Sequence, residues 1–319
     1  MRRPVLVTGG AGFIGSHLVD RLVGEGFAVK VLDNFSSGRI DNIAHRLGDV
    51  ELVRGDLKDP AVALEAAKGA DVVFHFAANP EVRVSSTNPE IHFGENVAAT
   101  FNVLEAMRKA DVKQLIFASS SSVYGEPETI PVSESAPIRP VSVYGASKAA
   151  CENLIHAYSH LYGIRVATLR YANVVGPLLR HGVIYDFVVK LMKKPDSLEI
   201  LGDGTQIRSY IHVSDAVEAT LKAWENLHRE FEVYNVGSED WIDVNQVAQI
   251  VTSVMGLKNV KYVYKPVLHG VGWLGDVKKI ALAIDKLKNL GWRLRMSSTQ
   301  AVREATKSIV EELKSQVSV

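Results

Sequence analysis

Short runs of apolar, often β-branched residues alternate with longer amphipathic stretches through the first half of the chain. Such runs are typical of buried strands, and six are predicted, at Val5–Val7, Val29–Leu32, Val50–Val53, Val72–Phe76, Leu115–Ala118 and Val166–Leu169. The stretches between them, such as Phe13–Gly24 and Asn96–Ala110, carry apolar residues at helical spacing. Because strands and helices alternate, the pattern predicts an α/β fold, a Rossmann-like doubly wound parallel sheet with helices on both faces.

The spacing of the elements changes after about residue 174, where proline and glycine residues divide shorter segments. We therefore expect a smaller C-terminal substrate lobe that is interleaved with the sheet. A strand at 234–237 is predicted to return to the sheet, and residues 299–314 predict an amphipathic surface helix. The expected sheet domain covers residues 1–173 with a return segment at about 232–245, and the expected second lobe covers residues 174–231 and 246–319.

The chain has 36 Lys plus Arg and 36 Asp plus Glu in 319 residues, so its formal net charge is zero. Without a broad cationic field, we expect no nucleic-acid partner and no binding to an anionic membrane. The single cysteine, Cys151, excludes an internal disulfide and fits a reducing compartment. No segment resembles a signal peptide and no apolar run approaches the roughly 20 residues of a membrane span. We therefore expect a cytoplasmic protein.

Three glycines at three-residue spacing, Gly9, Gly12 and Gly15, lie between the first predicted strand and the first predicted helix. Glycine lets the chain turn tightly there and brings backbone N–H groups and the positive helix end against a pyrophosphate. Asp33 ends the next strand, where a carboxylate accepts hydrogen bonds from the ribose hydroxyls of a dinucleotide. Because a carboxylate repels a 2′-phosphate, the pattern favours NAD over NADP. Arg39 is the nearby cation that weakens this preference.

A second carboxylate, Asp56, follows the third predicted strand in the sequence Gly55-Asp56-Leu57. In that place it either hydrogen-bonds the adenine amino group or forms a turn or helix cap. The sequence leaves these two alternatives equal.

Tyr144 and Lys148 are four residues apart, so on a helix they lie on one face. A free tyrosine has a pKa near 10, and a neighbouring ammonium together with a positive nicotinamide ring favours its ionised form. Tyr144 is therefore a candidate general acid and base. The serine run 119–122 ends a predicted strand at the carboxyl edge of the sheet, where open α/β folds bind ligands. Taken separately, the pair fits a helix surface and the serines fit a solvated loop; together they indicate a catalytic site.

These motifs occur in the order and spacing of a known family. The glycine motif, His75-Phe76-Ala77-Ala78, the serine run before Val123-Tyr124-Gly125, and Tyr144 with Lys148 resemble the extended short-chain dehydrogenase/reductases over nearly the whole chain. Within that family the chain most resembles the UDP-glucose 4-epimerases. The resemblance implies an NAD-dependent isomerase of galactose metabolism that interconverts UDP-galactose and UDP-glucose through a transient 4-keto sugar. It implies Ser120, Tyr144 and Lys148 as catalytic residues, and a homodimer built from the helices 96–110 and 144–162.

The resemblance also implies the residues around both ligands. Asn173 is expected to contact the nucleotide diphosphate, Arg208 to grip it as a bidentate donor, and Asp276 to lie near the uridine. Val183 and Ile280 are expected to line the substrate pocket, with Ile280 near C2 of the hexose. Beyond the glycines and Asp33, the expected cofactor-binding residues are Phe13, Ile14, Asn34, Ser37, Gly38, Asp56, Leu57, Phe76, Ala77, Ala78, Asn96, Tyr144, Lys148 and Tyr171.

Two positions depart from the family pattern. Trp273 stands three residues before Asp276, where an arginine is common, so diphosphate binding is expected to rest more on Arg208. Ser121 and Ser122 stand where the related sugar 4,6-dehydratases carry Asp and Glu. Because the acid that expels the C6 hydroxyl is absent, the sequence favours an epimerase over a dehydratase.

Other functions stay open on the sequence alone. A uronate 4-epimerase, a decarboxylase or a reductase of nucleotide sugars shares the same scaffold, and a non-catalytic dinucleotide sensor needs only the glycine loop. No metal is expected, because His75 and His212 lie in strand-like segments without metal-ligand spacing.

Overall fold

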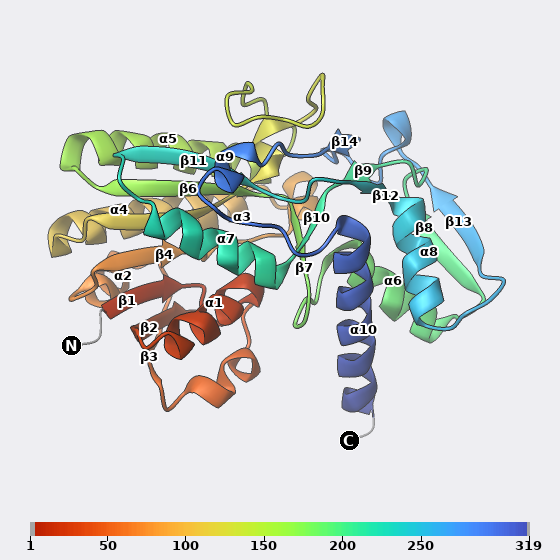
Figure 1. Cartoon of the computed structure of the whole chain (residues 1–319), viewed down its shortest axis with the longest axis horizontal. Helices are drawn as coiled ribbons and strands as arrows, with labels where there is room; N and C mark the ends of the chain where they lie inside the picture. Colours follow the sequence, from red (N-terminus) through yellow and green to blue (C-terminus); the bar gives the residue numbers. More distant parts are fainter. Residues whose placement is uncertain (1–3, 318–319) are drawn as a thin grey trace.

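A seven-stranded parallel sheet forms the centre of the protein, shown as a computed structural model in Figure 1; the structure describes residues 4–317. The strand order is β11-β6-β5-β4-β1-β2-β3, and every neighbouring pair runs parallel. The strands are β1 Pro4–Thr8, β2 Ala28–Asp33, β3 Val50–Arg54, β4 Val72–His75, β5 Gln114–Ser120, β6 Arg165–Tyr171 and β11 Phe231–Val236. The first six coincide with the predicted apolar runs, which confirms the predicted α/β fold.

Helices cover both faces of this sheet. On one face, α1 (Phe13–Gly24) packs with α7 (Val213–Glu225). On the other face, α2 (Pro60–Ala67), α4 (Ala99–Ala110) and α5 (Val143–Tyr162) lie side by side. The buried residues follow the helical spacing, so that each helix turns one apolar stripe toward the sheet.

The helix predicted over 96–110 differs at its start. The regular α-helix begins at Ala99, and Phe93–Ala98 form a π-helical segment. Asn96 lies in this segment with a fully buried side chain, whose Oδ1 accepts a hydrogen bond from the backbone N–H of Asn79 at 2.8 Å. Its Nδ2 donates to Ser147 Oγ at 2.9 Å. The wider turn thus accompanies a polar side chain that faces inward, a local irregularity often found near functional sites.

The smaller lobe stands beside the carboxyl edge of the sheet (Figure 1). Its helices α6 (Gly182–Lys193), α8 (Val244–Val254) and α10 (Ser298–Val317) pack around a second apolar core. Its strands form three small sheets, β10-β7 (Tyr210–His212, Asn173–Val175), β12-β9-β14 (Ile242–Asp243, Ile207–Arg208, Lys279–Ile280) and β13-β8 (Lys261–Lys265, Ser197–Leu201). The short helices are α3 (Glu90–His92) and α9 (Asp285–Lys288).

The chain passes between the two parts more than once. Strand β11 returns from the smaller lobe and pairs with β6 in parallel register from Phe231 to Val236. Helix α7 falls within the stretch 174–231 that is expected in the second lobe, yet it packs on α1. The reason is that Ala216 and Val217 are buried in the core of the large sheet.

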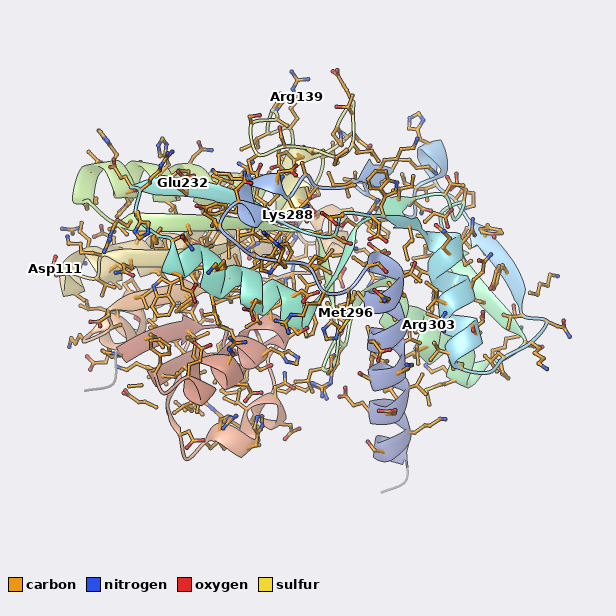
Figure 2. All side chains as sticks on the ribbon, viewed as in Figure 1. Asp111, Arg139, Glu232, Lys288, Met296 and Arg303 are labelled. Carbon is orange, nitrogen blue, oxygen red and sulfur yellow. The ribbon has the colours of Figure 1, made fainter. Side chains whose placement is uncertain are left out.

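The C-terminal helix α10 covers the predicted segment 299–314 and is amphipathic as expected. Val302, Ala305 and Ile309 are buried against α8 and β10, whereas Arg303 lies on the outer face (Figure 2). Charged side chains elsewhere, such as Asp111 and Arg139, likewise point outward in Figure 2. Within residues 4–317, no helix is both long enough and apolar enough to cross a membrane.

A buried ion pair joins helix α5 to the sheet. Nη2 of Arg170 on β6 donates to Oε2 of Glu152 on α5 at 2.6 Å, and the two side chains are only 4% and 5% exposed. Ser119 on β5 donates to Glu152 Oε1 at 2.5 Å, and Nη1 of Arg170 donates to Tyr124 Oη at 2.9 Å. Tyr124 in turn donates to Asn235 Oδ1 on β11 at 2.7 Å. One polar network therefore ties α5 to three strands and to the turn after β5.

We expect Glu152→Gln to lower the free energy of unfolding by about 3 kcal/mol, because it leaves Arg170 buried with no opposing charge. Urea denaturation followed by circular dichroism measures this change. Glu225→Gln is the matched control, since Glu225 pairs with Lys222 on the surface of α7 and such exposed pairs contribute less than about 1 kcal/mol. Equal losses in the two variants would contradict a special role for the buried pair.

Candidate active site

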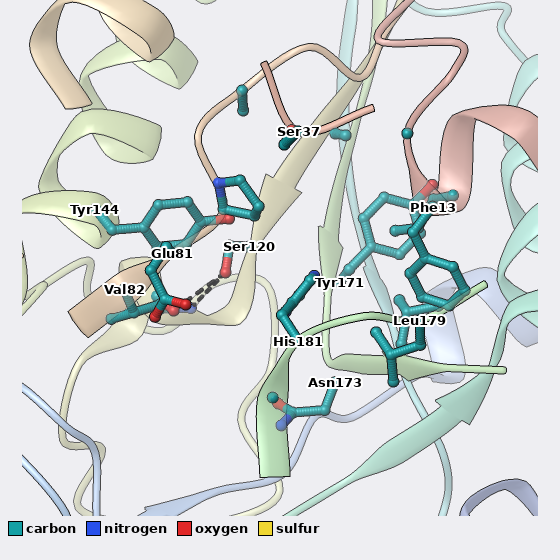
Figure 3. A pocket seen from close by; sticks show the side chains of 18 of the residues that line it. Phe13, Ser37, Glu81, Val82, Ser120, Tyr144, Tyr171, Asn173, Leu179 and His181 are labelled. Carbon is teal, nitrogen blue, oxygen red and sulfur yellow. Dashed lines mark hydrogen bonds between the residues drawn. The ribbon is translucent and has the colours of Figure 1, made fainter. Parts of the chain in front are cut away.

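A cavity of about 520 Å³ opens at the carboxyl ends of β1, β2, β4, β5 and β6 and extends toward the smaller lobe (Figure 3). The glycine loop, the serine run and residues of β9 and β14 all contribute to its wall. The structure thereby brings together all but one of the residues that the sequence predicts for the site. The predicted residues that line the cavity are Gly9, Gly12, Phe13, Ile14, Gly15, Asp33, Asn34, Ser37, Gly38, Asp56, Leu57, Phe76, Ala77, Ala78, Ser120, Tyr144, Lys148, Tyr171, Asn173, Val183, Arg208, Asp276 and Ile280.

Asn96 is the exception: it does not line the cavity, and its contact with the cofactor stays a prediction. Its side chain is 1% exposed and is held between the backbone of Asn79 and the hydroxyl of Ser147. Asn96 therefore lies behind the wall of the cavity and connects the segment after β4 to α5, the helix that carries Tyr144.

The glycine loop has no room for side chains. A Cβ at Gly15 would lie 2.1 Å from the Gly9 carbonyl oxygen, and a Cβ at Gly9 would lie 2.6 Å from the backbone nitrogen of Ala77. Gly9 also has a φ of 69°, which favours glycine. Within residues 4–317, no side chain caps the N-terminus of α1 at Gly12, so the first-turn N–H groups of this helix remain available to a pyrophosphate. The loop fits a dinucleotide.

Asp33 has a structural role in addition to the one predicted. Its Oδ2 accepts from the backbone N–H of Ala11 at 2.9 Å, and its Oδ1 accepts from that of Phe35 at 2.8 Å. Burial raises the pKa of Asp33, although these two hydrogen bonds oppose the rise. Each oxygen keeps a further acceptor position, so the residue is suited to hold the glycine loop and a ribose together. Arg39 is exposed and does not line the cavity.

Asp56 serves as a turn residue and also lines the cavity. Its Oδ1 accepts from the backbone N–H of Lys58 at 2.8 Å and its Oδ2 accepts from Asn34 Nδ2 at 3.2 Å. Burial would raise the pKa of Asp56, but these hydrogen bonds and the charge of Lys58 hold it below the usual value. The turn alternative is confirmed, and an adenine contact stays a prediction.

Ser120 and Tyr144 face each other across the inner end of the cavity (Figure 3). Ser120 is the last residue of β5, and Tyr144 lies in the first turn of α5, whose N-cap Ser142 accepts from the N–H of Gly145 at 3.0 Å. Burial raises the pKa of Tyr144 to about 12, while a hydrogen bond with Ser120 opposes the rise. Tyr144 is therefore protonated at neutral pH in the protein alone.

Lys148 lies beneath Tyr144 on the same helix. Its Nζ donates to the carbonyl oxygen of Ala118 at 2.7 Å, and the side chain is almost fully buried. Burial lowers the pKa of Lys148 to about 8, although the charge of Glu152 opposes this. Lys148 is not among the groups that shift the pKa of Tyr144. The ionisation of the phenol was predicted for Lys148 together with a nicotinamide ring, and it stays a prediction for the protein with its cofactor bound.

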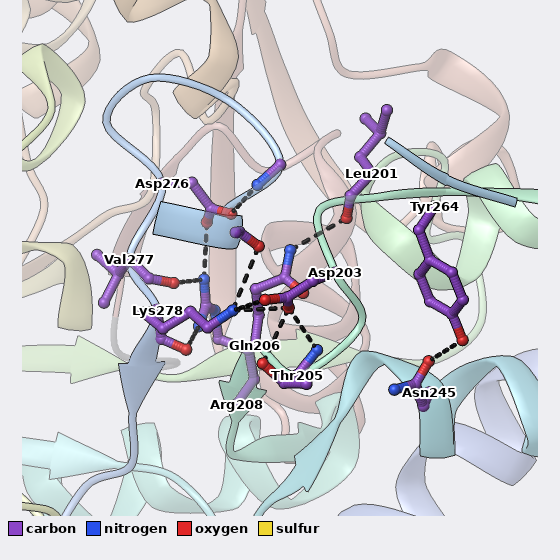
Figure 4. Close-up of polar contacts among 12 residues, drawn as sticks. Leu201, Asp203, Thr205, Gln206, Arg208, Asn245, Tyr264, Asp276, Val277 and Lys278 are labelled. Carbon is purple, nitrogen blue, oxygen red and sulfur yellow. Dashed lines mark hydrogen bonds and ion pairs between the residues drawn. The ribbon is translucent and has the colours of Figure 1, made fainter. Parts of the chain in front are cut away.

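An arginine and an aspartate meet at the end of the cavity formed by β9 and the segment before β14 (Figure 4). Arg208 Nη2 donates to Asp276 Oδ1 at 2.7 Å and also to the carbonyl of Val277, while Nη1 donates to the carbonyl of Ile207 at 2.8 Å. Asp276 Oδ2 accepts from the N–H of Gly272 at 3.1 Å. The two residues predicted for different parts of the nucleotide are thus partners of one another. Trp273 lines the same part of the wall.

The remaining predicted substrate residues come from the smaller lobe. Asn173 lies on β7, Val183 lies in the first turn of α6, and Ile280 lies on β14 opposite Arg208 in the register of β9. Ile280 is 6% exposed, so only a small part of it reaches the cavity.

Sequence reasoning missed a charged group that lines the cavity near Ser120 and Tyr144. Glu81 and Arg83 follow β4, Asp186 lies on α6, and His181 occupies the N-cap position of that helix without a side-chain capping hydrogen bond. The sequence did contain a signal for Glu81 and Arg83. Both follow the carboxyl end of a predicted strand, and charged residues in such a segment lie at the ligand-binding edge of a parallel sheet. His75, in contrast, is buried between Thr8 and Thr100 at 2.7 and 3.0 Å, and burial lowers its pKa to about 3. It is a hydrogen-bonding residue of the core, as its strand-like setting predicts.

Comparison with known proteins places this site in a family. A model described as the NAD dependent epimerase/dehydratase family matches residues 5–237. The chain belongs to this family. A putative UDP-glucose 4-epimerase from Methanocaldococcus jannaschii is 39% identical over 318 residues, which cover 97% of this chain and 98% of that protein.

Solved structures show the same relationship. A crystal structure of a UDP-galactose 4-epimerase is 50% identical with a TM-score of 0.88, covering 97% of this chain and 99% of that chain. A mutant of UDP-glucuronic acid 4-epimerase from Bacillus cereus, in complex with UDP-4-deoxy-4-fluoro-glucuronic acid and NAD, is 28% identical with a TM-score of 0.88 and the same coverage. The protein is accordingly an NAD-dependent member of the epimerase/dehydratase family.

Proposed function

We propose that the protein is a UDP-glucose 4-epimerase that interconverts UDP-galactose and UDP-glucose through a transient 4-keto sugar. The observation that carries the proposal is the convergence of Ser120, Tyr144 and Lys148 on one cavity with the glycine loop. The similarity to the UDP-galactose 4-epimerase of known structure supports it. A non-catalytic dinucleotide sensor has no use for this constellation.

The chain's own residues handle the C4 oxygen of the hexose. The hydroxyl of Ser120 holds that oxygen, and Tyr144 Oη takes its proton and later returns it. When bound, NAD supplies the hydride acceptor for C4 and, in its oxidised form, a positive charge beside the phenol. Lys148, fixed to the carbonyl of Ala118, keeps a donor beneath the phenol. Because burial raises the pKa of Tyr144, the phenol keeps its own proton and cannot accept another. It becomes the base only as the phenolate, after it releases that proton to solvent, which a positive charge beside it would favour.

The inversion requires the sugar to present its opposite face between the two half-reactions. We infer that the smaller lobe, through Asn173, Arg208 and Asp276, holds the nucleotide while the hexose turns about its diphosphate linkage. The absence of carboxylates at Ser121 and Ser122 argues against expulsion of the C6 hydroxyl, and so against a sugar dehydratase.

The test is an assay of purified protein with UDP-galactose and no added NAD, followed by sugar analysis. We expect UDP-glucose to form without net change in nicotinamide absorbance, because the hydride returns to the sugar. Tyr144→Phe should lower kcat by at least about 10³-fold, since it removes the proton-transfer group, and Ser120→Ala should lower it less. A stable absorbance change would point to a reductase, and normal turnover by Tyr144→Phe would refute the assigned base.

We further propose a homodimer that buries helices α4 and α5. Large apolar side chains are exposed on these helices: Phe101 is 44% exposed and Leu161 is 66% exposed. Light scattering at micromolar concentration should give a dimer, and Leu161→Asp should shift it toward monomer because a charge in an apolar interface is costly. Leu274→Asp is the matched control, since Leu274 is also 66% exposed but lies outside both helices. A monomeric native protein would contradict the proposal.

Ile280 is proposed to restrict the space near C2 of the hexose. Isoleucine is stiff at Cβ, and misplaced methyl groups change transition-state binding by about 1–3 kcal/mol, or about 10–200-fold. We expect UDP-glucose and UDP-galactose to react well and their N-acetyl forms to react poorly. Ile280→Gly should raise kcat/KM for the N-acetyl sugars, whereas Ile280→Val should change it little. Equal kcat/KM for both sugar classes in the native enzyme would argue against this role.

A further inference from the structure

A small charge network lines the cavity where the hexose is expected, and the proposed reaction does not use it. Glu81 caps the short helix Val82–Ser86, and its carboxylate accepts from Arg83 Nε at 3.0 Å and from Arg83 Nη2 at 3.2 Å. Arg83 Nη1 donates to Asp186 Oδ2 on α6 at 3.3 Å. One guanidinium therefore lies between two carboxylates that come from the two halves of the protein.

The position of this network follows from its neighbours. The helix Val82–Ser86 packs on α5, where the backbone N–H of Tyr144 donates to Ser85 Oγ at 3.1 Å. Figure 3 shows Glu81 projecting into the same part of the cavity as Tyr144 and Ser120. The carboxylate of Glu81 thus stands close to the group that handles the C4 hydroxyl. Its side chain is 35% exposed, so a ligand in the cavity is able to reach it.

The charge balance at this end of the cavity is negative. Burial would raise the pKa of Glu81, but the hydrogen bonds and charge of Arg83 outweigh it and hold the pKa below its usual value. Glu95 and Asp186 also line the wall. His181 adds no charge at neutral pH, because burial lowers its pKa even though Glu81 and Asp186 oppose the shift. Three carboxylates thus face a single guanidinium.

The other cations that line the cavity already have partners elsewhere. Arg180 pairs with Glu312, and Lys190 pairs with Glu199 on the outer side of α6. Arg208 pairs with Asp276 at the nucleotide end. Lys148 also lines the cavity near Tyr144, and its Nζ donates to the carbonyl oxygen of Ala118. Against the three carboxylates, Arg83 and Lys148 still leave this end of the cavity with excess negative charge.

We propose that Glu81 is a specificity residue that selects nucleotide sugars with a neutral hexose and rejects those with a C6 carboxylate. The proposal rests on the 4-epimerase function proposed above and deepens it. Glu81 is able to accept hydrogen bonds from sugar hydroxyls, whereas it repels a uronate. Like charges placed together in a partly buried site oppose binding strongly. The uronate 4-epimerase alternative is thereby disfavoured by one named side chain.

The experiment compares kcat/KM for UDP-galactose and UDP-galacturonic acid in the native protein, in Glu81→Gln and in Glu90→Gln. The native protein should prefer UDP-galactose by at least about tenfold, and Glu81→Gln should reduce that ratio about tenfold or more, because it keeps the shape and removes the charge. Glu90→Gln is the control, since Glu90 is exposed and lies outside the cavity; it should leave the ratio unchanged. Higher ionic strength should weaken the preference of the native protein but not that of Glu81→Gln.

Failure of this proposal is distinguishable from failure of the proposed function. The role of Glu81 would be overturned, and the epimerase function would stand, if the protein turns over UDP-galactose and uses UDP-galacturonic acid equally well. The same conclusion would follow if Glu81→Gln leaves the ratio of kcat/KM for the two substrates unchanged. No turnover of UDP-galactose would overturn the function. In that case calorimetric titration of the same three proteins with the two nucleotide sugars still tests Glu81, because its charge acts on binding. If Glu81→Gln leaves the ratio of the affinities for UDP-galactose and UDP-galacturonic acid unchanged, the proposal is refuted. If Glu81→Gln shifts that ratio toward UDP-galacturonic acid, the proposal is supported.

Discussion

The buried pair of Glu152 and Arg170 is the constraint on which the geometry of this site depends. A carboxylate and a guanidinium removed from water are tolerated only when both are well paired, and here Ser119, Tyr124 and the pair itself fill most of the available positions. The pair fixes helix α5 against the end of β6 one turn beyond Lys148. Tyr144 and Lys148 are therefore held at the carboxyl edge of the sheet by a contact that lies outside the cavity.

That rigid placement accounts for the electrostatics of the catalytic residues. Burial moves the pKa of Tyr144 up to about 12 and that of Lys148 down to about 8, since each shift favours the neutral form of a desolvated group. The charged groups of the protein itself therefore do not ionise Tyr144 for proton abstraction. In the proposed function, the positive charge of an oxidised cofactor would favour the phenolate, and proton transfer at C4 would thereby depend on the oxidation state of the dinucleotide. This coupling suits a reaction in which the same phenol first takes and then returns one proton.

Periodicity and motif spacing were sufficient to predict the sheet, because Val, Ile and Leu runs buried on both faces leave few alternatives for a parallel strand. Nearly all of the predicted site residues line the cavity, although the family resemblance, rather than periodicity, supplied most of them. The surroundings of Asn96 were not predicted: it lies in a π-helical turn, and its amide donates to Ser147 inside the protein. The contacts between Arg83 and Asp186 and between Arg208 and Asp276 join residues 103 and 68 positions apart, and no local pattern encodes such pairings.

Although the net charge of the whole chain is zero, the charges that line the cavity are not evenly distributed, and its two ends differ. At the nucleotide end, Arg208 is already bonded to Asp276 and to backbone carbonyls, so a diphosphate has to exchange with existing partners and gains less than it would from a free guanidinium. At the hexose end, Glu81 and Asp186 neutralise Arg83 and leave excess negative charge. An anionic group is accordingly opposed more strongly at the end with Glu81 and Asp186 than at the end with Arg208 and Asp276, whose charges balance. In the proposed function, this difference favours a nucleotide sugar whose diphosphate lies toward β9 and whose neutral hexose lies toward Tyr144.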